Sequence, residues 1–356
     1  MQNAIKKINV EIGVYSMKKV ALGTTGIEVS ALGMGAIQIT RLDWAESIKL
    51  VHEVMDLGIN LFDTARGYLD SELRLGDAFY GCRDKAIISS KSGAGDAVTL
   101  RENIDDTLKR LKTDYIDIFL FHGGEVVNQD DFCSPGGILQ VATDAVKAGK
   151  IRYLGFSTHR VETAMKALAY KELKVAMVPA NFMSREYIDG DFYKEACKNE
   201  VAVLAMKPFG GGRMVNARVC LKFLKSYPKL IPCIGIEKVS EMVENISIWE
   251  DEEALSSDDV NEMSRIKELL GEKYCRGCGY CMPCPEGIQI PTVTFLEIFA
   301  KQMPKDKVVI PEHSEIVKKA EQCIRCGKCI KKCPFSLAIP DMIEENVRFY
   351  KEFSAL

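Results

Sequence analysis

Short apolar runs alternate with longer amphipathic stretches from about residue 18 to residue 270. The short runs have the length and β-branched content of strands, and eight of them lie at 32–37, 60–65, 86–91, 115–122, 152–157, 176–181, 203–208 and 231–236. Between these runs lie stretches whose apolar residues recur at the spacing of a helix. Examples are 43–57, where Trp44, Ile48 and Val51 share one face, and 100–112. Eight strand–helix units predict an α/β protein built on a (β/α)8 TIM barrel. A doubly wound sheet is the alternative, but the chain lacks a glycine-rich dinucleotide turn.

The pattern changes at both ends of this region. Two short β-type runs, "KVALG" and "IEVSAL", predict a small hairpin, and residues 1–16, ahead of Met17, are expected to be an N-terminal extension. Beyond Gly271 the chain becomes rich in Cys, Gly and Pro and loses its periodicity. We therefore expect the barrel at 17–270 and a second, smaller domain at 271–356, with short helices at 292–302, 312–321 and 341–353.

Composition excludes several classes of protein. The net charge of -3 gives no case for binding nucleic acid or an anionic membrane, and no apolar run approaches the roughly 20 residues that span a bilayer. The N-terminus does not resemble a secretory signal, so a cytoplasmic location is expected. In that compartment the 13 cysteines argue against a disulfide framework. Five of them are scattered singly and are expected to be small buried or half-buried residues: Cys82, Cys133, Cys197, Cys220 and Cys233.

The other eight cysteines form two runs, "CRGCGYCMPCP" at 275–285 and "CIRCGKCIKKCP" at 323–334. The second run resembles the bacterial ferredoxin motif, whose fourth cysteine ligates the neighbouring cluster. Zinc sites usually present two separated pairs, and a single cluster is a further alternative. We expect two [4Fe-4S] clusters, one held by Cys323, Cys326 and Cys329 with Cys284 from the first run, and the other by Cys275, Cys278 and Cys281 with Cys333.

Four polar residues fall near the carboxyl ends of predicted strands, where barrel enzymes place their chemistry: Asp63, Tyr68, Lys91 and His122. The surrounding segments "NLFDTARGY", "SSKSG", "IDIFLFHGG" and "GKIRYLGFST" resemble the successive motifs of the aldo-keto reductase superfamily, over roughly residues 18–270. The resemblance implies the same barrel fold, a small carbonyl or alcohol substrate, and a catalytic tetrad formed by these four residues.

The chemistry of the tetrad agrees with that role. A free tyrosine has a pKa near 10, too high for easy proton donation, and a nearby Lys91 ammonium stabilises the phenolate of Tyr68 before the cost of desolvation is subtracted. Asp63 would keep Lys91 charged and placed, while His122 would orient and polarise the substrate oxygen.

The nicotinamide site departs from the family pattern. The resemblance places cofactor contacts at Ser157, Asn181, Met206, Glu244 and Asn245. Met206 stands where a stacking aromatic is common, and Thr158 stands where many members have Asn. Glu241 lies where members that bind the 2′-phosphate often carry a base, so NADH is favoured over NADPH. A flavin, or no dinucleotide, stays open.

The leading interpretation is an iron-sulfur aldo-keto reductase, an oxidoreductase that interconverts a carbonyl and an alcohol with electrons linked to NAD(P)H, to a ferredoxin-like partner, or to both. In one alternative the clusters are structural and turnover uses NADH alone. In another, the chain is an electron-transfer or assembly subunit whose barrel is catalytically retired. Residues 301–335 carry nine Lys or Arg against four acids, which suits either a solvated face or docking of an acidic electron carrier.

Overall fold

Eight parallel strands close into a barrel in the computed structural model, which describes residues 17–355. The expected extension at 1–16 lies outside the described residues. Neighbouring strands follow the chain order, and the last strand pairs with the first. They are β3 (Gly33–Gly35), β4 (Leu61–Asp63), β5 (Ile87–Ser92), β6 (Ile116–Phe121), β7 (Ile151–Ser157), β8 (Leu173–Pro179), β9 (Ala202–Met206) and β10 (Leu230–Gly235). The predicted TIM barrel is confirmed.

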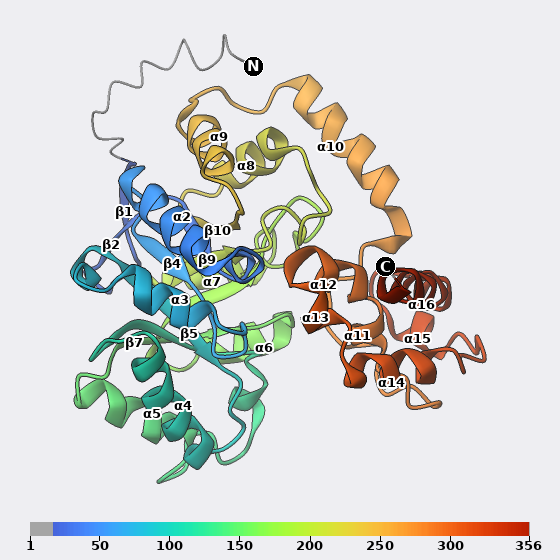
Figure 1. The fold of residues 1–356 in the computed structure, drawn as a ribbon, viewed down its shortest axis with the longest axis horizontal. Coiled ribbons are helices and arrows are strands. Elements are labelled where there is room, and N and C mark those ends of the chain that lie inside the picture. Colours follow the sequence, from blue (N-terminus) through green and yellow to red (C-terminus); the bar gives the residue numbers. More distant parts are fainter. Residues whose placement is uncertain (1–16, 356) are drawn as a thin grey trace.

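Helices surround the barrel and bury their apolar faces against its strands (Figure 1). They are α2 (Trp44–Asp56), α3 (Ser71–Ala78), α4 (Ala97–Arg110), α5 (Ile138–Lys147), α6 (Val161–Ala167), α7 (Asp191–Lys198), α8 (Ala217–Lys225) and α9 (Val239–Glu250). Asp43 caps α2 and Asp96 caps α4 with side-chain oxygens that accept backbone N–H bonds. The second cap starts α4 three residues before the predicted 100–112.

The predicted hairpin is also present, as the antiparallel pair β1 (Lys19–Ala21) and β2 (Glu28–Ser30). Its residues Leu22, Ile27 and Val29 join a buried cluster with side chains that fill the barrel, such as Leu61 and Ile118. The hairpin therefore packs against the barrel interior and leaves the chemistry to the carboxyl ends of the strands.

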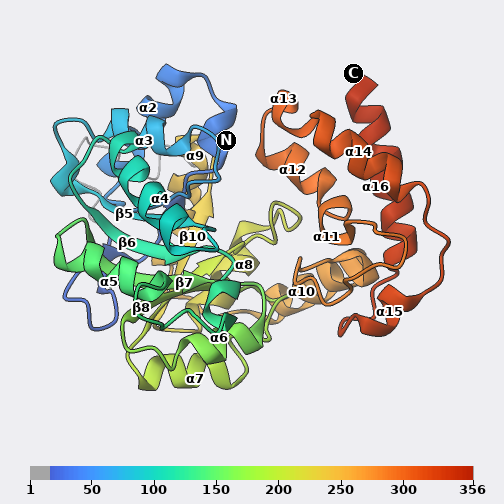
Figure 2. The ribbon, with the colours of Figure 1, turned by 90° about the horizontal axis from the view of Figure 1, so that it is seen from below.

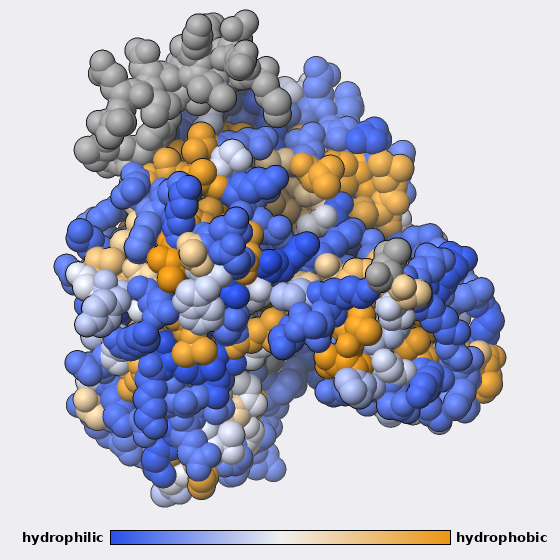
Figure 3. All heavy atoms as spheres, in the orientation of Figure 1, coloured by the Kyte–Doolittle hydropathy of each residue, from blue (hydrophilic) through white to orange (hydrophobic). Residues whose placement is uncertain are grey.

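After α10 (Ser257–Leu270), which a capping box at Ser256 and Asp259 starts, the chain forms a helical tail with a hydrophobic cluster of its own. Its helices are α11 (Ile290–Val293), α12 (Leu296–Gln302), α13 (Lys305–Val308), α14 (Pro311–Ala320), α15 (Lys328–Lys332) and α16 (Ile339–Ala355). Figures 1 and 2 place the tail on one side of the barrel, and the space-filling view shows it as a second lobe (Figure 3).

The predicted helix at 292–302 is two helices. α11 ends at Val293 and α12 begins at Leu296, with Phe295 between them. The Thr294 hydroxyl donates to the carbonyl oxygens of Ile290 and Pro291 and lies 3.5 Å from the Cys275 sulfur. The Phe295 ring lies 4.8 Å from the Lys207 ammonium. Contacts with the cysteine run and the barrel thus accompany a break that periodicity alone does not reveal.

Candidate active site

The structure brings the four predicted catalytic residues together at the carboxyl end of the barrel. Asp63 ends β4, Lys91 lies in β5, His122 follows β6, and Tyr68 lies between β4 and α3. The Lys91 Nζ lies 2.6 Å from Asp63 Oδ2 and 4.9 Å from the centre of the Tyr68 ring. The rings of Tyr68 and His122 meet edge to face with centroids 6.0 Å apart.

Two further hydrogen bonds fix the ion pair. Lys91 Nζ donates to the Thr64 carbonyl at 2.6 Å, and Ser89 Oγ donates to Asp63 Oδ1 at 2.9 Å. Burial by itself would lower the pKa of Lys91, but the charges of Asp63 and Tyr68 outweigh it and raise the pKa of the ammonium. Lys91 is therefore held charged, as the sequence predicts.

Burial is the largest influence on the pKa values of both Tyr68 and His122. It raises the pKa of Tyr68 more than the Lys91 charge lowers it, so the net direction is opposite to the effect of Lys91 alone. Burial, together with the charges of Lys91 and Lys207, lowers the pKa of His122 to about 4. Near neutral pH the phenol thus keeps its proton and the imidazole is neutral, with one N–H to donate.

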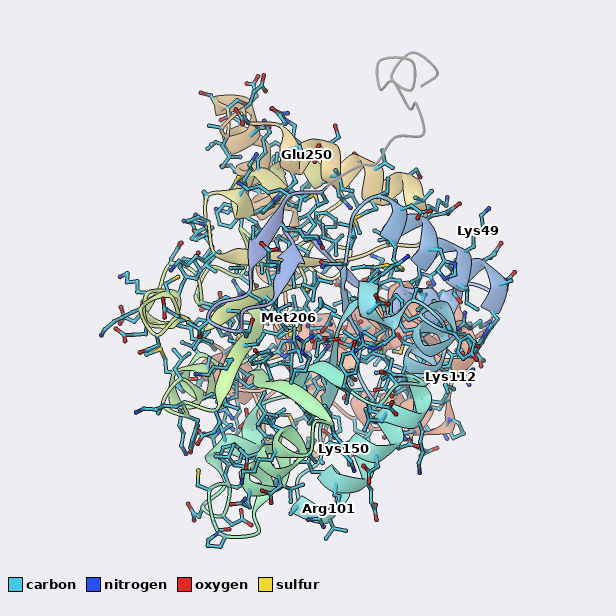
Figure 4. All side chains as sticks on the ribbon, turned by 90° about the vertical axis from the view of Figure 1, so that its left-hand side faces the viewer. Lys49, Arg101, Lys112, Lys150, Met206 and Glu250 are labelled. Atoms are coloured by element: carbon cyan, nitrogen blue, oxygen red, sulfur yellow. The ribbon has the colours of Figure 1, made fainter. Side chains whose placement is uncertain are left out.

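A pocket of about 400 Å³ opens beside the tetrad. Asp63, Tyr68, Met206 and Cys233 are among the residues that line it. In Figure 4 Met206 lies toward the middle of the ring of strands, whereas the labelled charged side chains lie at its periphery. Two residues of the tail, Lys301 and Gln302, line the same pocket. The barrel and the tail therefore form this pocket together.

Lys207, which sequence reasoning did not single out, also lines the pocket. Its Nζ lies 2.9 Å from His159 Nε2, and within residues 17–355 no carboxylate lies within ion-pairing distance of it. Burial, and then the charge of Arg213, lowers the pKa of Lys207 to about 8. The only sequence signal is its place in "LAMKPFGGG", directly after a residue that ends a strand.

The predicted nicotinamide contacts separate into different environments. Ser157 Oγ is buried and has no hydrogen-bond partner within the described chain, which suits a polar group of a ligand. Asn181 is already engaged, because its Nδ2 donates to the Lys207 carbonyl at 2.9 Å and to the Tyr274 hydroxyl at 3.0 Å. Its Oδ1 accepts the backbone N–H groups of Met183 and Ser184. Asn181 therefore ties the barrel to the start of the tail.

The predicted adenosine contacts lie on α9. Asn245 is buried and Glu244 is exposed, and neither lines the pocket. The Glu241 carboxylate accepts hydrogen bonds from the N–H groups of Glu237 and Lys238, at 2.8 and 3.2 Å. These amides at the start of α9 are donors that a phosphate could otherwise use. A carboxylate of the chain itself occupies them.

Several side chains fasten the tail to the mouth of the barrel. Arg213, in the loop after β9, donates to the Cys275 carbonyl at 2.8 Å and stacks over the Tyr274 ring at 4.1 Å. Arg276 donates to the Met183 carbonyl at 2.6 Å. The Tyr280 hydroxyl bonds to the Glu162 carboxylate. The first cysteine run is thereby held directly against the loops that surround the pocket.

The eight clustered cysteines line two adjoining cavities. Cys275, Cys278, Cys281 and Cys333 line the first cavity. Cys284, Cys323, Cys326 and Cys329 line the second, which Cys281 also touches. Within residues 17–355 no three His, Cys, Asp or Glu side chains are close enough to share one metal ion. Each set is instead spread around a cavity, with one cysteine contributed by the other run.

Family models match two parts of the chain. The model described as "Aldo/keto reductase family" matches residues 31–218. The model described as "4Fe-4S dicluster domain" matches residues 267–344. No helix within residues 17–355 is both long and apolar enough to span a bilayer.

Similar proteins match the barrel region. A 6-dehydroglucose reductase of Novosphingobium aromaticivorans is 30% identical over 217 residues, covering 55% of this chain and 70% of that protein. An NADH-specific methylglyoxal reductase of Escherichia coli is 30% identical over 231 residues, covering 56% and 70%.

Solved structures agree at the level of the fold. A putative aldo-keto reductase from Pseudomonas aeruginosa superposes with a TM-score of 0.59 at 26% identity, covering 66% of this chain and 96% of that one. An aldo-keto reductase from Bacillus halodurans superposes with a TM-score of 0.61 at 21% identity, covering 70% and 96%.

Proposed function

Because the chain belongs to the aldo/keto reductase family, we propose that the Tyr68 phenol and its polar neighbours interconvert a small carbonyl compound and its alcohol. The chain is an oxidoreductase that also carries a 4Fe-4S ferredoxin-like domain. The observation that carries the proposal is the buried pair of Lys91 and Asp63, 2.6 Å apart, beneath Tyr68 at the carboxyl end of the barrel.

In the direction of reduction, Tyr68 donates the proton to the substrate oxygen. Its raised pKa keeps the phenol protonated until the substrate oxygen becomes negatively charged. Lys91 then stabilises the phenolate that remains, and Asp63 keeps the ammonium in place. Neutral His122 donates a hydrogen bond to the same oxygen and fixes its position.

The pocket fits a nicotinamide cofactor in part. When bound, NADH would supply the hydride that the carbonyl carbon accepts. Ser157, whose buried Oγ has no partner within residues 17–355, would hold the carboxamide. Met206 would provide an apolar wall in place of an aromatic one. Glu241 favours NADH over NADPH, because its carboxylate already fills the start of α9 and would repel a 2′-phosphate.

The tail would hold two [4Fe-4S] clusters, which exchange single electrons when bound. The four cysteines of each cavity form one thiolate ligand set, with Cys333 and Cys284 crossing between the runs. Iron and acid-labile sulfide analysis of protein purified without oxygen should give about eight irons per chain. About four irons, or none, would contradict the two-cluster assignment.

Tyr68→Phe tests the barrel chemistry. The variant keeps the ring but loses the proton donor, so carbonyl reduction should fall by at least about 100-fold. Its iron content and its unfolding midpoint should match those of the parent. A panel of small aldehydes and ketones, assayed with NADH, NADPH and a reduced flavin in turn, measures the loss and identifies the hydride donor. Full activity in the variant would show that another group donates the proton.

A second candidate is an electron-transfer subunit whose barrel no longer binds a dinucleotide. The observation in its favour is Asn181, whose amide is already bonded to Lys207 and Tyr274. Calorimetric titration with NADH separates the candidates. Binding that Ser157→Ala weakens supports the reductase, whereas no binding by NADH, NADPH or flavin supports the retired barrel.

A further inference from the structure

The second cysteine run lies on the side of the tail that faces away from the barrel. Figures 1 and 2 both place α15 in the tail, farther from the barrel than α11. The first cavity adjoins the contacts that Arg213 and Arg276 make between the barrel and the tail. The second cavity adjoins the first on the side away from these contacts. The order is therefore pocket, first cavity, second cavity and solvent.

Apolar side chains are exposed around this outer end. Ile324 is 63% exposed although it also lines the second cavity, and Ile330 is 37% exposed. Cys326 lies between them in the sequence and is the cluster cysteine classed as exposed. These two isoleucines beside the outer cavity would give a partner protein an apolar contact next to the cysteines.

The same surface is positively charged. Residues 322–340 contain Arg325, Lys328, Lys331 and Lys332 and no acid. Lys328 and Lys331 are exposed and lie within ion-pairing distance of no carboxylate in the described chain. Lys332 lies 3.3 and 3.2 Å from the Met282 and Pro283 carbonyls.

The acids that face this surface do not neutralise it. Asp341 and Glu344 both pair with Arg325. Glu286, directly after the first cysteine run, lines the second cavity, and within the described residues it forms no ion pair with the lysines of this surface. The charges of Lys328, Lys331 and Lys332 are therefore available to pair with acidic groups of a partner protein.

We propose that this outer patch (Ile324, Cys326, Lys328, Ile330, Lys331 and Lys332) is the docking surface of a small acidic electron-carrier protein. The inference rests on the proposed cluster in the second cavity, and it names the partner that exchanges electrons with it. The exposed isoleucines pack against the apolar surface around the carrier's redox centre, and the lysines attract the acidic rim of the carrier. Docking here brings the carrier to Cys326, the most exposed ligand of the outer cavity.

The test is the rate of cluster reduction, measured without oxygen by the loss of iron–sulfur absorbance in a stopped-flow instrument. The reductants are a reduced plant-type [2Fe-2S] ferredoxin, which is acidic, and titanium(III) citrate, which needs no docking site. The double variant Lys328→Glu, Lys331→Glu reverses the charge of the patch. Lys109→Glu with Lys147→Glu changes the net charge equally on exposed positions of the barrel.

The patch variant should lower the second-order rate constant with ferredoxin by about 10-fold or more, and added salt should slow the parent protein toward the same rate. The barrel variant should stay within about twofold of the parent, and titanium(III) citrate should reduce all three proteins equally. Equal ferredoxin rates in the parent and the patch variant, or an equal loss in both variants, would overturn the docking surface. Failure of both reductants to change the absorbance of any protein would instead contradict the proposed clusters.

Discussion

The candidate site is built from side chains whose charge states depend on burial. Lys91 stays charged because Asp63 and Tyr68 outweigh the desolvation of its ammonium. His122 stays neutral near pH 7 because burial, and then the charges of Lys91 and Lys207, lowers the pKa of its imidazole. The sequence places Asp63, Lys91 and His122 near strand ends and Tyr68 in the following loop, and barrel geometry gathers the carboxyl ends of its strands. Whether the pKa of each side chain is raised or lowered depends on how the folded chain packs around it, and the spacing of residues along the sequence does not describe that packing.

His122 should make the folded protein less stable in mild acid. Its pKa is about 4 in the folded chain, below the ordinary 6.5, so between these values the unfolded chain binds more protons. The stabilisation is present in full above pH 6.5 and is lost as the pH falls toward 4, by roughly 3 kcal/mol. Urea unfolding at pH 7 and pH 5 should therefore show a smaller pH dependence in His122→Asn than in the parent.

His52→Asn, which replaces an exposed histidine outside the pocket, serves as the matched control. His159, whose pKa burial also lowers, should leave a residual dependence in the His122 variant. An identical difference between pH 7 and pH 5 in the parent and in His122→Asn would contradict the assignment.

At the scale of elements, close strand packing depends on glycine at one point of the barrel. Gly155, in β7, faces β8 so closely that a Cβ atom would lie 2.0 Å from the Val175 carbonyl oxygen and 2.6 Å from Leu120 Cδ2. The pairing of β7 with β8 also shifts register between Leu154 and Gly155. The obstacle is backbone, which cannot rotate away as a side chain can.

Gly155→Ala should therefore destabilise the barrel by about 3 kcal/mol or more. Gly35→Ala is the matched control, because a Cβ in that barrel strand would meet its nearest neighbour at an ordinary 3.5 Å. Urea unfolding followed by far-ultraviolet circular dichroism measures both. A Gly155→Ala midpoint equal to that of Gly35→Ala would mean that β8 moves aside at little cost.

Strands and helices of the barrel follow closely from the sequence, because each unit carries its own apolar pattern. The elements of the tail follow less well. At the break between α11 and α12, Thr294 contacts the Cys275 sulfur and Phe295 contacts Lys207 of the barrel, and periodicity encodes neither contact. The surroundings of Lys207 and Asn181 are hidden from the sequence for a similar reason, since Phe295 and Tyr274 reach them from more than 60 residues away along the chain.

The whole molecule joins a barrel and a tail through one set of contacts, at the mouth of the pocket. Lys301 and Gln302 line the pocket from the tail, while Arg213 reaches from the barrel to the Cys275 carbonyl. Lys207 and Arg213 are half-buried cations in this junction, and neither pairs with a carboxylate within the described residues. A cluster with four thiolate ligands in the first cavity would place negative charge beside them.

Lys207→Met should therefore move the reduction potential of the first cluster to more negative values, by tens of millivolts, because the loss of a nearby positive charge favours the oxidised form. Lys207→Arg keeps the charge and should keep the potential near that of the parent. Redox titration followed by electron paramagnetic resonance measures both variants, with Lys147→Met on the outer face of the barrel as the remote control. If Lys207→Met and Lys147→Met both leave the potential unchanged, the charge of Lys207 acts on the pocket alone. The junction would then be a mechanical link between the two parts of the chain.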